Sequence, residues 1–411
     1  MLKAQALTDS IYMPSIKTIK FFQQNNQESL PVIRLHSSDL VELHFDDLDG
    51  VVKNYYYTFQ LCNANWEAAD ISSFDYIQGY QQMMISQYRI SSISQVKYIH
   101  YMALLPENNY IPIKSGNYLL KVYLNADLTQ LAFTKRFFVV DSKVNLSTQF
   151  SQPIDNALMY THQKIQFTLN TRALSLYNPQ QQIKVAILQN NRWDNALTDF
   201  QPTFIRNNIL EYSGEDGYLF QGMREFRWAD LRTFIFQTER VDSVNKKLLP
   251  IDIYLKPDIS RSRSGYLTMN DLNGSYEVST TEAENPWWQG DYANVHFTYL
   301  PNNQTPFEDK DLYMVGELTG NALTKEAKMK YNEEKGVYEK ILLLKQGYYN
   351  YAYVTKNKND ASAKADASLT EGNFWETENN YTILVYYRSV DGRYDELVAV
   401  TTFNTRNGTS L

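Results

Sequence analysis

The dominant pattern along the chain is an alternation of apolar and polar residues, which is the period of a half-buried β-strand. In residues 164–169 the sequence KIQFTL places Ile165, Phe167 and Leu169 on one face, and residues 251–256 (IDIYLK) repeat the pattern. Residues 381–388 (YTILVYYR) are bulky on both faces, which predicts a strand that is covered on both sides. The same alternation predicts further strands at 39–45, 54–61, 98–104, 118–124, 132–140, 183–189, 233–238, 295–299, 312–316, 338–345 and 348–355.

Turn signals separate these segments. Asn273-Gly274 follows Asp271, and this pair favours a β-hairpin turn because both central residues must adopt positive φ. Many short strands at a spacing of about 8–12 residues are typical of β-sandwiches. Because 411 residues exceed one sandwich, we expect an all-β chain of tandem immunoglobulin-like or early-set-like sandwiches. Breaks in the pattern divide it into 1–142, 143–284 and 285–411.

Composition supports strands and argues against several functions. The chain has 32 tyrosines and 20 phenylalanines, which favour pleated surfaces over helices. A formal net charge of −7 argues against binding to nucleic acid. No run of 18 apolar residues is present, so a membrane-spanning helix is not expected. The opening residues lack the pattern of a signal peptide, so the protein is either not secreted or given as the mature chain of an exported protein.

The sequence predicts neither catalysis nor metal binding. The single cysteine, Cys62, lies in an apolar strand pattern and is expected to be a buried structural thiol. The five histidines form no metal-binding motif, and no nucleophile-elbow, dinucleotide or phosphate-loop motif occurs. Asp47 and Asp271 begin calcium-like DxDG and DxNG segments that lack the remaining EF-hand ligands, so both are expected to form Asx turns. We expect no cofactor and no small-molecule ligand, although a tertiary carboxylate pair for glycoside hydrolysis stays open.

The six tryptophans are candidates for the core, for protein contacts or for sugar stacking. Trp287 and Trp288 are adjacent, and neighbouring residues on a strand point to opposite faces. At least one ring of this pair is therefore expected outside a single core, as a partner contact or in packing between domains.

A series of segments in order resembles the plug protein family of the type IX secretion system, over about residues 15–400. They are YYYTFQLCNANW (55–66), FDYIQGY (74–80), SGNYLLKVY (115–123), THQKIQFTLN (161–170), LQNNRWDNA (188–196), MREFRWADLR (223–232), DLNGSYEV (271–278), DYANVHFTY (291–299), KGVYEKILLLKQGYYNYAYV (335–354) and EGNFWETENNYTILVYYR (371–388).

This resemblance implies a soluble periplasmic protein without enzymatic activity. It implies binding to the periplasmic mouth of the giant outer-membrane translocon β-barrel, which releases folded cargo through a lateral gate. The barrel's other partner is a small membrane-barrel shuttle protein. A plug of this family seals the central pore when the gate is open.

The region from about residue 290 also resembles the sandwich of glycogen-binding modules, through DLYMVGELTGNALT (311–324) and MKYNEEKGVYEKILLLKQGYYNYAYV (329–354). Sugar binders of that class carry a Trp after a turn that here reads Leu318-Thr319-Gly320-Asn321-Ala322, so the likeness concerns the scaffold. The alternative function is a carbohydrate-binding or glycan-processing surface protein, which predicts a coplanar pair of exposed aromatic rings.

Overall fold

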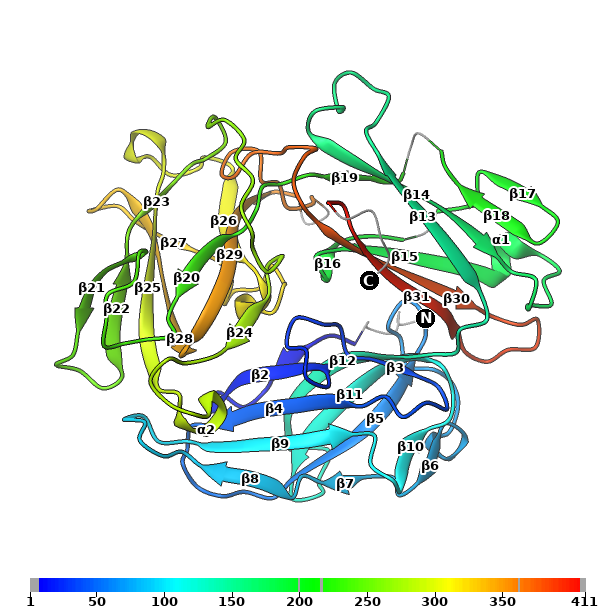
Figure 1. The fold of residues 1–411 in the computed structure, drawn as a ribbon, viewed down its shortest axis with the longest axis horizontal. Helices are drawn as coiled ribbons and strands as arrows, with labels where there is room; N and C mark the ends of the chain where they lie inside the picture. Colours follow the sequence, from blue (N-terminus) through cyan, green and yellow to red (C-terminus); the bar gives the residue numbers. More distant parts are fainter. Residues whose placement is uncertain (1–6, 199, 215–216, 361–362, 407–411) are drawn as a thin grey trace.

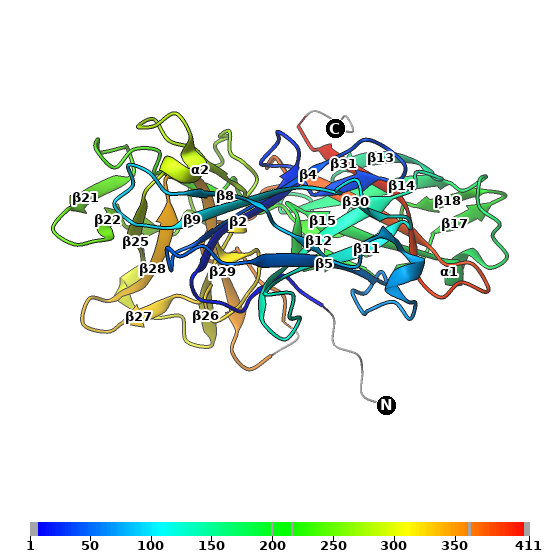
Figure 2. The same ribbon diagram turned by 90° about the horizontal axis from the view of Figure 1, so that it is seen from below.

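Three β-sandwiches form a triangular body in the computed structural model of the protein, which describes residues 7–198, 200–214, 217–360 and 363–406. Figure 1 shows the first sandwich at the bottom, the second at the upper right and the third at the left. Figure 2, seen from below, shows that the body is flattened. The predicted all-β architecture of several sandwiches is confirmed.

The first sandwich packs two sheets around one hydrophobic core. One sheet contains β1 (Ser10–Ile11), β12 (Leu131–Val140), β11 (Gly116–Leu124), β5 (Tyr55–Cys62), β7 (Met83–Met84) and β3 (Val32–Arg34). The other contains β2 (Ile16–Gln23), β4 (Val41–Asp47), β9 (Ile99–Leu105) and β8 (Gln87–Ile90). A small sheet of β6 (Ile77–Gly79) and β10 (Tyr110–Pro112) and the short 3-10 helix η1 (Ser73–Asp75) lie beside them.

The second sandwich is built from two segments that are far apart in the sequence. One sheet contains β13 (Asn145–Ser151), β14 (His162–Asn170), β18 (Ile209–Tyr212), β17 (Phe204–Arg206) and β19 (Leu219–Gln221). The other contains β16 (Arg192–Leu197), β15 (Ile183–Gln189), β30 (Asn380–Tyr387) and β31 (Glu396–Asn404), with α1 (Pro179–Gln182) leading into β15.

The third sandwich is inserted between β19 and β30. One layer contains β20 (Arg227–Asp230), β29 (Gly347–Asn357), β24 (Tyr276–Val278) and β26 (Lys310–Val315). The other contains β21 (Val241–Asn245), β22 (Ile251–Leu255), β25 (Tyr292–Leu300), β28 (Val337–Lys345), β27 (Lys330–Asn332) and β23 (Asp258–Ile259). The short helices α2 (Pro286–Gln289), η2 (Asn302–Gln304) and η3 (Glu317–Thr319) lie in its connections.

The sheets divide the chain differently from the expected segments 1–142, 143–284 and 285–411. β30 and β31 return to the second sandwich, where Val185 pairs with Val385, and β20 to β24 belong to the third. The boundary at 284/285 falls between strands of one core. The contiguous division failed because strand pairing joins segments that are distant in the sequence. Residues 1–6 and 407–411 of the expected segments lie outside the described residues.

The structure also differs from two local predictions, the strand at 233–238 and the hairpin at Asn273-Gly274. Residues 233–238 form an irregular loop because the Glu282 carboxylate accepts the backbone N–H groups of Phe234 and Ile235, which holds this segment away from a ladder. Asn273 and Gly274 have the expected positive φ of 50° and 83°. Their turn leads from an irregular segment into β24, so it does not join two paired strands.

Candidate functional site

The described residues contain no group of three or more His, Cys, Asp or Glu side chains that is arranged to hold a metal ion. Cys62 is buried, as predicted, and burial raises the pKa of its thiol to about 12. The carboxylates of Asp47 and Asp271 accept the backbone N–H groups of Asp49 and Asn273, which confirms the two Asx turns. The features that distinguish the molecule are instead the contacts between its sandwiches.

Trp287 and Trp288 lie on the single-turn helix α2, whereas the sequence interpretation placed them on a strand. The ring of Trp287 stacks on His44 of the first sandwich, with ring centroids 3.9 Å apart, and also packs against the third core. The backbone carbonyl of Trp288 accepts the N–H of Ser92, and its ring lies 6.0 Å from the Arg89 guanidinium. The pair therefore joins the third sandwich to the first, and a contact of either ring with another protein stays a prediction.

A buried polar network lies beside Trp287, at the interface of the first and third sandwiches. We call it the Asp46 network, and it consists of His44, Asp46, His100, Tyr292 and Lys345. The Asp46 carboxylate lies 2.7 Å from His100 Nδ1, and it accepts hydrogen bonds of 2.5 Å from both Tyr292 Oη and Lys345 Nζ. His44 Nδ1 lies 3.1 Å from His100 Nε2.

The electrostatics of this network follow from its burial. Lys345 is fully buried and Asp46 is only 1% exposed. Burial alone would raise the pKa of Asp46, but Lys345 and His100 outweigh it and hold this pKa below its ordinary value. Burial lowers the pKa of His100 to about 4 despite the neighbouring carboxylate. The network therefore contains one buried ion pair, between Asp46 and Lys345, and a neutral His100 at pH 7.

The sequence did not predict this network. His44 and Asp46 share the polar face of β4, opposite Leu43 and Phe45, and such a face is ordinarily solvated. The register that brings His100 opposite Asp46 arises from the β4–β9 pairing. The remaining partners come from residues about 250 and 300 positions further along the chain, for which no local signal exists.

A second buried contact joins the same two sandwiches. Lys20 is 1% exposed and donates to the Glu317 carboxylate at 2.7 Å and to the Tyr276 carbonyl at 2.9 Å. The Gln27 side chain exchanges hydrogen bonds with the backbone N–H and carbonyl of Val278. This interface thus has polar anchors on both β2 and β4.

The first and second sandwiches meet through an apolar layer. Leu119 and Phe138 of the first pack with Leu188, Leu384 and other residues of the second. Because β15 and β30 also contribute to the core of the second sandwich, both are covered on two faces, as predicted for 381–388. Arg136 lies beside the rings of Trp66 and Trp193, 4.5 and 5.1 Å from their centroids, and the two rings meet edge to face.

The second and third sandwiches are joined by the two chain crossings between them. Met223 and Phe226 of the outgoing crossing pack with Val315, Ala352 and Val354 of the third sandwich. On the returning crossing, the fully buried Glu371 binds Arg227 at 3.0 Å and Arg261 at 2.7 Å. Burial opposes ionisation of Glu371, but the two arginines lower its pKa to about 2. Buried contacts therefore join the first sandwich directly to the other two, whereas the crossings, packed on the third sandwich, link it to the second.

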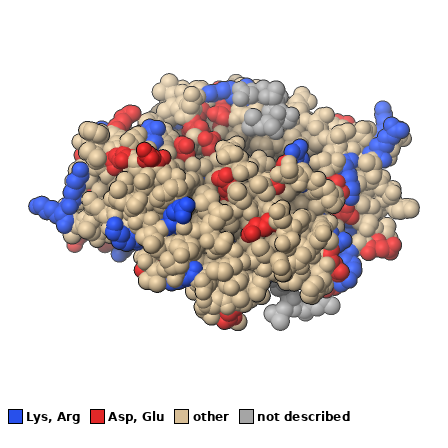
Figure 3. Space-filling model, turned by 60° about the horizontal axis from the view of Figure 1, so that its bottom comes forward, with Lys and Arg blue, Asp and Glu red and all other residues tan. Residues whose placement is uncertain are grey.

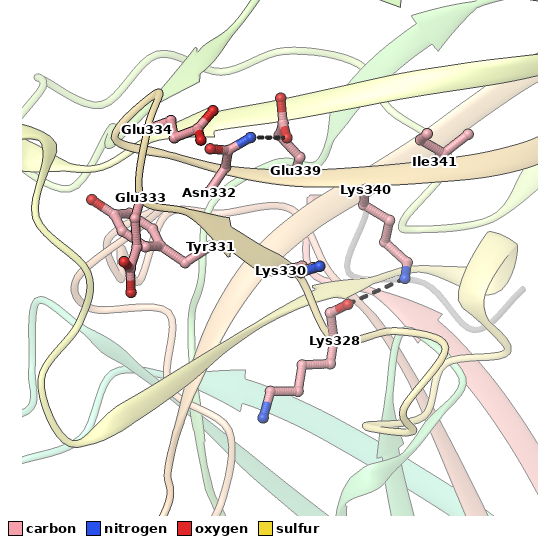
Figure 4. A pocket seen from close by; sticks show the side chains of 9 residues that line it. All are labelled: Lys328, Lys330, Tyr331, Asn332, Glu333, Glu334, Glu339, Lys340 and Ile341. Atoms are coloured by element: carbon pink, nitrogen blue, oxygen red, sulfur yellow. Dashed lines mark hydrogen bonds between the residues drawn. The ribbon is translucent and has the colours of Figure 1, made fainter.

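A surface hollow of about 760 Å³ lies over the β27–β28 hairpin (Figure 4). Its lining includes both positively charged lysines and negatively charged glutamates. Glu339 accepts hydrogen bonds from Asn332 and Lys335. The ring of Tyr331 is held by a hydrogen bond from its hydroxyl to the Gln304 carbonyl. Of the six tryptophans, all of which are described, Trp66 is buried and the other five are half-buried.

Within the described residues, no helix has the length and apolar character needed to cross a membrane.

Comparisons with known proteins agree with this architecture. Residues 16–141, which form the first sandwich, match the family described as the type 9 secretion system plug protein, first domain. A crystal structure of a hypothetical protein from Parabacteroides merdae is similar over 98% of this chain and 100% of that chain, with 31% sequence identity and a TM-score of 0.93. No curated protein matches the chain. The chain therefore belongs to the type 9 secretion system plug family, and its first sandwich is the first domain of that family.

Proposed function

We propose that the protein binds the periplasmic mouth of the type 9 secretion translocon barrel and seals its pore while the lateral gate is open. It does so as a folded body, without catalysing a reaction and without a cofactor. The family assignment supports an association with this secretion system. The closed triangle of sandwiches is the observation that carries the more specific role.

A seal must keep its shape under load. Domains within one chain ordinarily move relative to one another unless their interfaces are large and apolar. Here an apolar layer joins the first and second sandwiches, ion pairs of the buried Lys20 and Lys345 join the first to the third, and a buried ion pair fixes the crossing that returns to the second onto the third. Moving the sandwiches apart would break these contacts and expose the apolar layer to water. The triangle is therefore expected to behave as one rigid unit that is wide in two dimensions, as a cap over a round opening requires (Figures 1 and 2).

Affinity capture tests the proposed partner. The tagged full-length protein, incubated with detergent-solubilised outer membranes, is expected to retain a very large barrel subunit. A matched sample in which Asp46→Asn loosens the triangle is expected to retain less. Capture of no large barrel subunit by the wild-type protein would contradict the proposal, and binding to soluble glycans in a gel-shift would favour the carbohydrate-binding alternative.

A further inference from the structure

Residues 76–96 of the first sandwich carry exposed apolar side chains and almost no charge. Residues 76–96 contain a single charged residue, Arg89. Within this segment Tyr80, Met84, Ile90 and Ile93 are 62%, 42%, 65% and 70% exposed. Figure 3 brings this sandwich forward and shows broad areas without charged side chains. A surface that is rich in Tyr and Met and poor in Lys and Glu has the composition of a protein contact.

The strand β8 at this side has backbone groups available for pairing. β8 ends its sheet, and its described partner is β9 alone. Ser91 N–H donates to the Tyr98 carbonyl, so alternation along the strand directs the N–H and C=O groups of Tyr88 and Ile90 away from β9. Within the described part of the chain no hydrogen bond is formed by these outward N–H groups. The edge is short and carries one charge, Arg89, but it has no proline or bulge that would prevent pairing with a further strand.

We propose that β8 is the docking edge for an extended segment of the translocon partner, which adds to the sheet as a further strand. This inference rests on the proposed function. The added strand bonds to the outward backbone groups of Tyr88 and Ile90, a mode of recognition that uses main-chain hydrogen bonds for affinity. β7, which ends the other sheet of the sandwich, precedes β8 by two residues, so Met84, Tyr88 and Ile90 lie along one open side.

The side chains of β8 define the chemistry of that segment. Apolar residues at alternate positions of the added strand pack against Tyr88 and Ile90. Arg89 points to the opposite face, where it contacts the Trp288 ring and forms no ion pair with another described residue. An acidic residue between the apolar positions would complement this charge. The partner segment is therefore extended, apolar at every second residue and acidic opposite Arg89.

Affinity measurements with the intact protein and the detergent-solubilised barrel test this assignment. The double variant Tyr88→Lys/Ile90→Lys places charges on the edge and is expected to weaken binding at least about tenfold. Tyr88→Pro removes an outward N–H group but no hydrogen bond to β9, and it is also expected to weaken binding. The matched control is Phe204→Lys/Ile205→Lys on β17, the exposed apolar edge of the second sandwich, which is expected to bind within about twofold of wild type. Thermal unfolding verifies that every variant is folded.

Amide hydrogen exchange of the wild-type complex gives a readout that does not depend on a variant. The amides of Tyr88 and Ile90 are expected to exchange at least about tenfold more slowly with the barrel bound. Unchanged exchange, or equal binding by wild type and β8 variants, overturns the inference while leaving the proposed function intact. Wild type that does not bind the barrel overturns the proposed function itself. A wild-type dimer that the β8 variants abolish would assign the edge to a second copy and would also overturn the inference.

Discussion

His100 Nδ1 lies 2.7 Å from the Asp46 carboxylate, and this distance fixes the tautomer of the imidazole ring. A carboxylate only accepts, so Nδ1 carries the proton and Nε2 of neutral His100 accepts from His44 Nδ1, 3.1 Å away. Burial of the ring opposes protonation of His100 although the carboxylate favours it, and Asp46 lies at the centre of the contact between the first and third sandwiches.

Asp46→Asn is expected to destabilise the protein by about 3–5 kcal/mol, because it leaves Lys345 buried without its carboxylate. Chemical denaturation at pH 7 measures the change. Asp46→Asn combined with Lys345→Met should recover part of the loss, since no unpaired charge is then buried. The control is a substitution of Glu339 that breaks its exposed ion pair with Lys335, and it should leave the unfolding midpoint unchanged. If Asp46→Asn alone is as stable as the wild-type protein, the prediction that this ion pair stabilises the fold is wrong.

Stability is expected to fall as the pH falls from about 7 to 4. An unfolded histidine titrates near 6.5, whereas the pKa of His100 in the folded protein is about 4, so the unfolded state takes up the proton first. The contribution of His100 is complete above pH 6.5 and amounts to about 3 kcal/mol. Burial also lowers the pKa of His162, which acts in the same direction. Urea unfolding of His100→Asn should show a shallower pH dependence, and an unaltered slope would assign the effect elsewhere.

The two adjacent tryptophans are expected to differ in their effect on stability. Trp287→Ala removes a ring that stacks on His44 and packs against the third core, and should cost about 3 kcal/mol. The ring of Trp288 contacts Arg89, and Trp288→Ala should cost less than about 1 kcal/mol. Thermal and chemical unfolding of both variants compare them directly. Equal losses would show that the ring of Trp288 is also a structural element.

Cys62 should be unreactive in the folded protein. Its thiol is fully buried and its pKa is raised to about 12, so little thiolate forms at pH 8. Ellman's reagent should label one thiol per chain in guanidinium chloride and essentially none in buffer. Rapid labelling of the native protein would mean that the layer between the first and second sandwiches opens.

Strand positions were predictable because they depend on local alternation. The predicted strand at 164–169 falls within β14, and the two-sided strand at 381–388 became β30 between two apolar layers. The tyrosine excess is mostly a core property, since the largest fully buried side chains are all tyrosines.

Long-range pairing was not predictable in the same way. The join of β15 to β30 spans about 200 residues, and nothing within either strand specifies its partner. The loop at 233–238 alternates like a strand, but the distant Glu282 binds its backbone. The Asp46 network likewise combines residues that are about 250 and 300 positions apart. It was not predictable because a polar strand face has the same sequence pattern in water and at a domain interface.

Single-channel conductance of the translocon barrel in a planar bilayer tests the sealing role most directly. With the lateral gate open, addition of the wild-type protein to the periplasmic side should close a large conductance, and addition to the opposite side should not. Asp46→Asn, matched for concentration, should close it less completely. A conductance that persists at saturating wild-type protein would contradict the proposal that this molecule is the seal.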